Sequence, residues 1–460
     1  MTALLVPPPP RRPPVVLVRD QFVDVVRLGA MALVVLQHWL MPVLTFEGGE
    51  LRTANAFATD WVWPVTWLSQ VMPLVFFAGG AAAAMSARRH GAGSAWVARR
   101  LYRLAVPVLV LAAVWLPLTP LLVATGLPAQ PVHTGARYVG GLLWFLAAYT
   151  LVTALGPLLL RLAVRARGVD VALLAAGAVV VDVARFAGGM PAALAYVNVL
   201  LVWGAVHQVG VHYAAGRLWW LRGTWALACT VGGFAVVAVA VVAGPYPPSM
   251  VGMPGDAVSN MGPPTAVLLA LAVGQLSLAL ALRPAVLRWT ESETVRRTVA
   301  RLSARVMTAY VWHTPALVLV AGVTLLGLGW GTPHPFSAAW YAGLPLWLTV
   351  LGAVLAVLVR LLGPVERWPL PALAPGPARV TVATVLLGGG LLGLTLTGFA
   401  PAPVLGPAGP WAASLAVGGG LLVLARRRPT IDRWTRLRSQ TAPDVPSADR
   451  DGQSVARTGA

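Results

Sequence analysis

The chain alternates between long apolar stretches and short polar segments. A window of about 19 residues, the length that a helix needs to cross a hydrocarbon layer, finds twelve apolar stretches. They cover approximately residues 22–44, 62–85, 104–125, 139–160, 169–187, 192–213, 224–244, 264–282, 306–329, 338–362, 379–398 and 409–425. Because helices satisfy their backbone polar groups internally, no strands are needed in lipid. The pattern predicts an all-α, polytopic membrane helix bundle with about twelve transmembrane helices.

All 34 basic residues are arginines, and their positions orient the predicted bundle. Short loops rich in arginine stay on the cytoplasmic side of a membrane. With the N-terminus inside, only Arg52, Arg137 and Arg185 fall outside, which leaves 31 of the 34 arginines inside. We therefore expect a multi-pass protein of the cell (cytoplasmic) membrane, embedded in the lipid bilayer, with both termini in the cytoplasm.

The composition is that of a membrane protein and excludes a water-soluble enzyme. Hydrophobic residues make up 58% of the 460 positions and charged residues only 11%, and the mean hydropathy is +0.75. A net charge of +19 is also typical of nucleic-acid-binding proteins. Here the arginines are explained by their place on the cytoplasmic side of the predicted bundle, so we expect no nucleic-acid partner. The single Cys229 excludes an intramolecular disulfide and a CxxC pair.

Three segments outside the apolar stretches have distinct compositions. Residues 1–18 hold a proline run and lack a small-residue cleavage site, which predicts a cytoplasmic N-terminal segment and no cleaved signal peptide. Residues 429–460 are rich in Asp, Ser, Arg and Gly, which predicts a disordered cytoplasmic tail. The outer loop at residues 245–264 is rich in Pro and Gly, and fits either an ordered lid or a long connector.

Ionisable side chains inside a span are costly and are therefore functional candidates. Arg27 and His38 lie eleven residues apart in the first span, so they share one helical face about 16 Å apart. Asp24 lies on that face three residues before Arg27 and can orient its guanidinium. Two simpler interpretations remain: Arg27 reaches to the inner headgroups, and His38 forms an interhelical hydrogen bond.

Other polar residues in the spans have plain structural explanations. His313 follows Tyr310 by three residues, which fits an interhelical hydrogen-bonded pair as well as a functional one. Asp182 and Arg185 are spaced for a local ion pair near the outer surface. Gln275 fits a hydrogen bond between helices.

Several common catalytic motifs are absent from the sequence. It has no GxSxG, HExxH, Walker or strand-borne GxGxxG motif, and no histidine is followed by Asp in an HxxxxD pattern. His207 and His212 lie five residues apart, which turns them about 140° from each other on a helix and argues against a joint metal site. Any catalysis must use the polar residues of the membrane segments.

Five segments, taken together and in order, resemble the acyltransferase-3 family of integral membrane acyltransferases. They are RDQFVDVVRLGAMALVVLQHWL, WPVTWLSQVMPLVFFAGG, WVARRLYRLAVP, LLWFLAAYTLV and AYVWHTPALVL. Arg27 and His38 fill the places of the family's Arg and His in the first span, and Arg100 and Arg103 match its RxxR pair. Where the family often has Ser in FFxxSG, this chain has Ala78-Gly79-Gly80. The resemblance covers residues 19–362, a ten-helix membrane domain, and makes the two helices of 363–428 an addition.

The resemblance implies an enzyme that moves a short acyl group, most often acetyl, from cytoplasmic acyl-CoA to a hydroxyl of a sugar, glycan or small molecule. His38 would act as general base toward that acceptor. Arg99, Arg100 and Arg103, together with Arg27, would contact the phosphates or thioester of the donor, although the positive-inside rule also explains them. Asp24, Tyr310 and His313 are possible substrate-binding residues. No metal or prosthetic group is expected.

Two alternatives to an acyltransferase remain at the level of the sequence. A twelve-helix secondary transporter would also have many spans and buried polar residues. The short link between the sixth and seventh spans, and the lack of similarity between the two halves, argue against it. The other alternative is a non-catalytic membrane partner of a biosynthetic complex.

Overall fold

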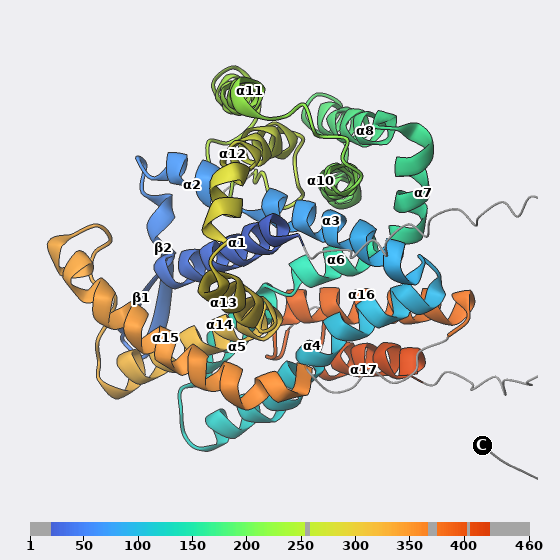
Figure 1. The fold of residues 1–460 in the computed structure, drawn as a ribbon. Coiled ribbons are helices and arrows are strands. Elements are labelled where there is room, and N and C mark those ends of the chain that lie inside the picture. Colours follow the sequence, from blue (N-terminus) through green and yellow to red (C-terminus); the bar gives the residue numbers. More distant parts are fainter. Residues whose placement is uncertain (1–19, 254–257, 367–374, 403–404, 424–460) are drawn as a thin grey trace, which may run out of the picture. The chain divides into compact units, whose positions relative to one another are not determined.

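The computed structural model describes residues 20–253, 258–366, 375–402 and 405–423, and this part is mostly helical (Figure 1). Its elements are α1 (Gln21–Leu40), β1 (Pro42–Glu47), β2 (Glu50–Asn55), η1 (Ala56–Ala58), α2 (Trp63–Ser69), α3 (Met72–His90), α4 (Ser94–Ala124), α5 (Ala129–Gly141), α6 (Trp144–Ala154), α7 (Gly156–Ala166), α8 (Val169–Phe186), α9 (Ala192–Ala195), α10 (Asn198–Ala214), α11 (Gly223–Ala243), α12 (Val267–Trp289), α13 (Glu293–Ser303), α14 (Val306–Gly322), η2 (Val323–Gly327), α15 (Ala338–Glu366), α16 (Pro377–Thr397) and α17 (Gly409–Val423). The predicted segments 1–18 and 429–460 lie outside the described residues.

Helices occupy every one of the twelve predicted stretches. In the described part of the chain, ten helices or helix pairs are long and apolar enough to cross a membrane. The two other stretches are α8, which carries three charged side chains (Asp170, Asp182 and Arg185), and α17, which has only 15 residues. A polytopic membrane helix bundle is therefore confirmed, and the count of twelve spans stays a prediction.

A small antiparallel hairpin follows α1, where the sequence analysis expected no strands. Met41 still has a helical conformation and donates to Gln37 O, but Pro42 lacks the backbone N–H that the next helical hydrogen bond needs, so α1 ends at Leu40. Strands β1 and β2 pair from Pro42↔Asn55 to Glu47↔Glu50. Gly48 and Gly49 connect them with φ values of 61° and 85°, the positive values that a two-residue hairpin turn requires. The last residues of the predicted stretch 22–44 are thus part of β1 and not of the helix.

The predicted span at residues 62–85 is broken into α2 and α3 at Gln70 and Val71. In a membrane the backbone groups at such a break need partners from neighbouring helices. Gln275 of α12 supplies them, since its Nε2 donates to Trp67 O at 2.7 Å and to Gln70 O at 2.9 Å. The prediction that Gln275 links helices is confirmed.

Glycines let α3 and α10 pack with their backbones almost in contact. A Cβ added at Gly80 would lie 1.9 Å from the carbonyl oxygen of His207, and one added at Gly210 would lie 2.0 Å from that of Phe77. Close approach of this kind is typical of helix pairs in membranes. The Ala78-Gly79-Gly80 segment therefore serves helix packing, which explains small residues at this point of the chain.

The last two described helices, α16 and α17, form a pair that packs against α4, α5 and α6. Gly393 of α16 lies directly against the ring of Trp411, and Gly390 lies against the backbone of the same residue. Phe399, just after α16, donates its backbone N–H to Ala136 O of α5 at 3.1 Å. These contacts place α16 beside α6, as Figure 1 shows.

Candidate active site

His38 lies near the C-terminal end of α1, and its Nδ1 is 2.7 Å from the backbone oxygen of Val34. A carbonyl oxygen only accepts hydrogen bonds, so in this contact Nδ1 carries the proton and donates it. In the neutral ring, Nε2 then has a free lone pair. Geometry thus leaves His38 with the proton-accepting nitrogen that a general base requires.

His313 of α14 lies beside His38, with the two ring centres 5.2 Å apart. Its Nδ1 donates in the same way to a backbone oxygen, that of Tyr310, at 2.5 Å. His313 is completely buried, and its Nε2 has no hydrogen-bond partner among the described residues. Two imidazoles from different helices therefore present unprotonated Nε2 atoms in one small region.

Tyr310 of α14 lies beside His313 and makes an interhelical hydrogen bond. Its hydroxyl donates to Leu142 O at 2.6 Å, and its ring centre lies 5.7 Å from that of His313. The interhelical bond is thus made by Tyr310 to the end of α5, whereas His313 bonds within its own helix. The expected interhelical hydrogen bond is therefore found for Tyr310 and not for the His313 Nδ1.

A cavity of about 870 Å³ opens beside His38. Gln37 and His38 of α1 and Tyr310 of α14 line one part, and helices α6 and α16 line another. Described residues of the 245–264 loop, including Val251 and Ser259, also contribute to the wall. The site therefore combines polar side chains with a large apolar wall.

The proline-rich loop is ordered where it meets the bundle. Asn260 is fully buried, and its Nδ2 donates to Pro247 O and Ser249 O, each at 2.8 Å. Met250 O accepts from Gln70 Nε2 at 2.8 Å, which fastens the loop over the break between α2 and α3. Of the two interpretations of this loop, the ordered one holds for its described residues; whether it acts as a lid stays a prediction.

Arg100 is the member of the arginine group on α4 that turns into the bundle. Its Nη2 donates to the hydroxyl of Tyr149 at 3.2 Å, and its guanidinium lies over the ring of Trp96 at 5.0 Å. Arg99 is half-buried and Arg103 is exposed. Arg99 faces a different direction from Arg100 because the two residues are about 100° apart on the helix.

A column of packed aromatic rings connects Arg100 with the histidine pair. Tyr149 lies 5.7 Å from Phe145, and Phe145 lies 5.4 Å from Tyr310, measured between ring centres. Phe76 of α3 packs edge-on against Phe145 at 5.6 Å. Arg100 and His38 therefore lie at the two ends of one packed group rather than in direct contact.

Arg27 pairs with Asp24 as the sequence predicts, at 3.4 Å between Nη2 and Oδ1. Its Nε is buried and has no hydrogen-bond partner among the described residues. The described contacts include no hydrogen bond or ion pair from Arg27 to His38, since eleven residues of helix separate them by about 16 Å. The structure thus brings His38, His313 and Tyr310 together, and leaves Arg27 with Asp24 at another level of α1.

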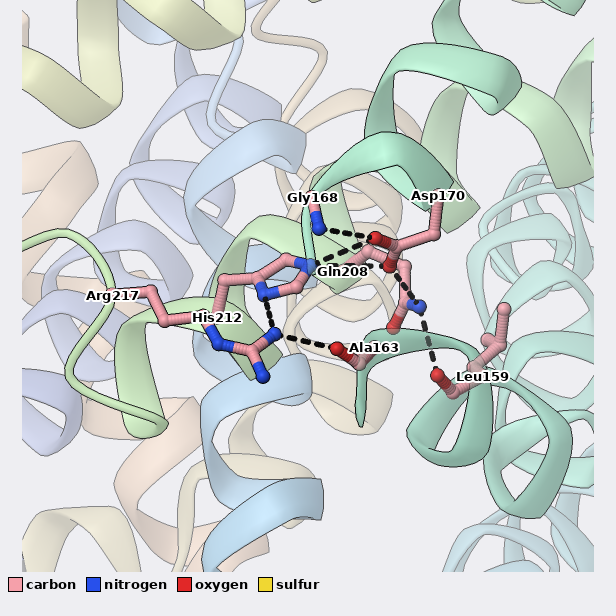
Figure 2. A network of polar contacts seen from close by, with 7 residues as sticks. All are labelled: Leu159, Ala163, Gly168, Asp170, Gln208, His212 and Arg217. Carbon is pink, nitrogen blue, oxygen red and sulfur yellow. Dashed lines mark hydrogen bonds and ion pairs between the residues drawn. The ribbon is translucent and has the colours of Figure 1, made fainter. Parts of the chain in front are cut away.

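A buried polar network that the sequence analysis missed surrounds Asp170 (Figure 2). Its carboxylate accepts from His212 Nε2 at 3.0 Å, from Gln208 Nε2 at 2.7 Å and from the backbone N–H of Gly168 at 3.0 Å. Arg217 donates to His212 Nδ1 at 2.8 Å, so both ring nitrogens of His212 are engaged. No ring nitrogen of His212 is left for proton transfer. The network therefore has a structural role and stabilises the junction of α7, α8 and α10. The sequence signal for this network was Asp170, a carboxylate in the first turn of a predicted span.

Asp182 is fully buried and also holds helices together, instead of forming the expected ion pair. Its oxygens accept from Asn198 Nδ2 at 2.9 Å, from the Tyr246 hydroxyl at 3.0 Å and from the Ala266 backbone at 2.6 Å. Burial and the nearby carboxylate raise the pKa of Tyr246 above its usual value, so its hydroxyl stays protonated and donates. Arg185 lies over the ring of Phe186.

The described residues contain no group of three or more His, Cys, Asp or Glu side chains arranged to hold a metal ion. His207 is buried in α10, and its Nδ1 has no hydrogen-bond partner in the described part of the chain. The chemistry that the arrangement around His38 can perform is proton transfer by an imidazole next to a partly apolar cavity.

The family model for an acyltransferase domain matches residues 20–365, about three-quarters of the chain. The chain belongs to the acyltransferase-3 family. Membership indicates acyl transfer in a membrane as the class of its activity. The matched segment of this acyltransferase contains the histidine pair and the arginines of α4, whereas α16 and α17 follow it. No curated protein and no solved structure matches the chain.

Proposed function

We propose that this acyltransferase transfers a short acyl group, acetyl in the simplest case, from cytoplasmic acyl-CoA to a hydroxyl of an acceptor. The observation that carries the proposal is the orientation of His38, whose Nδ1 donates to Val34 O and whose ring borders the cavity. Nε2 takes the hydroxyl proton while the oxygen attacks the thioester carbon. The new C–O bond forms as the C–S bond breaks, and the CoA thiolate leaves and takes up the proton.

The arginines support the donor side of this proposal. Acyl-CoA carries phosphates, which arginine binds through bidentate, charge-assisted hydrogen bonds. Arg99, Arg100 and Arg103 lie in the first turns of α4, on the side predicted to be cytoplasmic. Arg27 lies between that side and His38 along α1, and its side chain is 32% exposed.

The test is acyl transfer from radiolabelled acetyl-CoA in membranes that contain the wild type or His38→Ala, with total cell extract as acceptor. Loss of a general base lowers the rate about 10²–10⁴-fold, so we expect labelled product from the wild type alone. His334→Ala is the matched control, because His334 is exposed and outside the cavity. A His38→Ala protein that inserts normally and keeps full transfer would contradict the proposal. Substrate flux in vesicles without any acyl donor would favour a transporter.

A further inference from the structure

The cavity beside His38 continues as a groove along α6. Ala147, Ala148 and Leu151 of α6 form its floor. Helix α16 forms one wall, and Tyr196, just before α10, and Val199, in its first turn, form the other. The lining residues of α16 extend from Thr384 to Leu396, which on a helix is about 18 Å. The groove therefore runs along a large part of the membrane-spanning length of α16.

The groove opens sideways toward the bilayer. Val385, Leu392 and Leu396 of α16 line it, yet they are 67%, 51% and 59% exposed. Apolar side chains exposed on a membrane-spanning helix face hydrocarbon rather than water. A molecule in the lipid can thus enter the groove without passing through either aqueous side.

Glycines on α16 divide into two sets with different surroundings. Gly390 and Gly393 are packed against Trp411 of α17, as described above. Gly388 and Gly389 border the cavity, and a Cβ added to either would meet no atom within 4 Å. Because helix packing does not require the second pair to be small, their lack of side chains keeps the groove open.

The wall on α16 offers few hydrogen bonds. Thr384 and Thr395 are its hydroxyl-bearing residues on α16, and each donates to a carbonyl of its own helix at 2.8 Å. The polar groups Gln37 and His38 lie together on α1. This distribution fits a molecule with a polar head and a hydrocarbon tail.

We infer that the groove holds the hydrocarbon tail of the acceptor, so that the acceptor is a membrane lipid with a hydroxyl in its headgroup. This inference rests on the proposed function, in which His38 receives the proton of that hydroxyl. The donor does not need such a groove, because acyl-CoA arrives from water at the arginine-rich side. A sideways opening suits a substrate that resides in the bilayer.

The first experiment identifies the phase in which the product is found. Membranes with wild-type protein receive radiolabelled acetyl-CoA and a total lipid extract, or the water-soluble fraction of the same cells. The inference predicts label in the organic phase, dependent on His38. Label confined to water-soluble products would overturn it.

The second experiment fills the groove from α16. Gly388→Leu and Gly389→Leu are expected to lower transfer to lipid at least tenfold, with Gly388→Ala in between. Gly420→Leu is the matched control: Gly420 is a helical glycine of α17 with open space around it, outside the cavity, and transfer should stay within twofold of the wild type. Full transfer by folded Gly388→Leu protein would refute the inference.

A binding measurement separates this inference from the proposed function. Lipids retained by the purified protein are extracted and quantified by mass spectrometry for the wild type, His38→Ala and Gly388→Leu. We expect equal retention in the first two and at least fivefold less in Gly388→Leu. If no acyl donor gives a product, the proposed function fails, but the lipid measurement still tests the groove. Equal lipid retention in all three proteins would refute the inference that the groove holds a lipid tail.

Discussion

His38 and His313 are linked to the backbone through the same ring nitrogen, and their free Nε2 atoms lie in one region. A buried polar atom without a partner costs about 1–3 kcal/mol, and the cost applies to His313 Nε2. Such an atom is expected at a functional site, where substrate or a bound water completes its hydrogen bonding. The sequence predicts that His38 and Arg27 share one face of α1. That His313 lies beside His38 depends on how α1 packs against α14, and spacing along one helix does not encode this packing.

His313→Phe keeps a ring of similar shape and removes Nε2. We expect kcat/KM for acyl transfer to fall at least tenfold, because the substrate or the His38 imidazolium loses a hydrogen-bond acceptor. Steady-state assays in membranes measure this. The control is Thr308→Val, which removes a buried hydroxyl that has no partner among the described residues, on the same helix and away from the cavity. Unchanged kcat/KM in His313→Phe would assign His313 to packing alone.

The helices themselves follow from the hydrophobic pattern, whereas their interruptions depend on partners far away in the chain. The break at Gln70 is stable because Gln275 satisfies its carbonyls, and no window of 19 residues contains that information. The hairpin had a local signal, two glycines between residues suited to strands, that the search for spans passed over. Small residues in the Ala78-Gly79-Gly80 segment were noted from the sequence, but their contact with α10 required the structure.

Gly210→Val tests the close contact between α3 and α10. The added side chain would meet the backbone of Phe77, and overpacking costs about 1–3 kcal/mol. Thermal unfolding of the purified protein should therefore begin several degrees lower than for the wild type. Gly232→Val provides the comparison, because Gly232 of α11 has no atom within 4 Å of an added Cβ. Equal unfolding temperatures for both variants would show that α3 and α10 can move apart without loss of stability.

For the molecule as a whole, the arginine distribution predicts which side faces the cytoplasm. The hairpin of β1 and β2 is expected outside and α13 inside. Both carry exposed residues, Thr53 and Thr298, suited to labelling. The donor site and the free Nε2 of His38 then lie at different depths, which matches a donor from the cytoplasm and an acceptor from the bilayer.

Cysteine labelling in intact cells checks this orientation. Replacement of Cys229, the single cysteine, gives a background without thiols in one step. In that background Thr53→Cys should react with a membrane-impermeant maleimide, and Thr298→Cys only after permeabilisation. The opposite result would invert the topology and place acyl-CoA on the wrong side for this site.

Helix α16 borders the cavity of His38 although it follows the segment that the family model matches. Substitutions on its open face reach the cavity without changing α1 or α14. In the proposed function, α16 thus adds acceptor-contacting residues from outside the matched segment, whereas His38 and His313 lie within it. Substitutions on α16 are therefore expected to change which acceptor the enzyme takes while the histidines that carry out the reaction stay as they are.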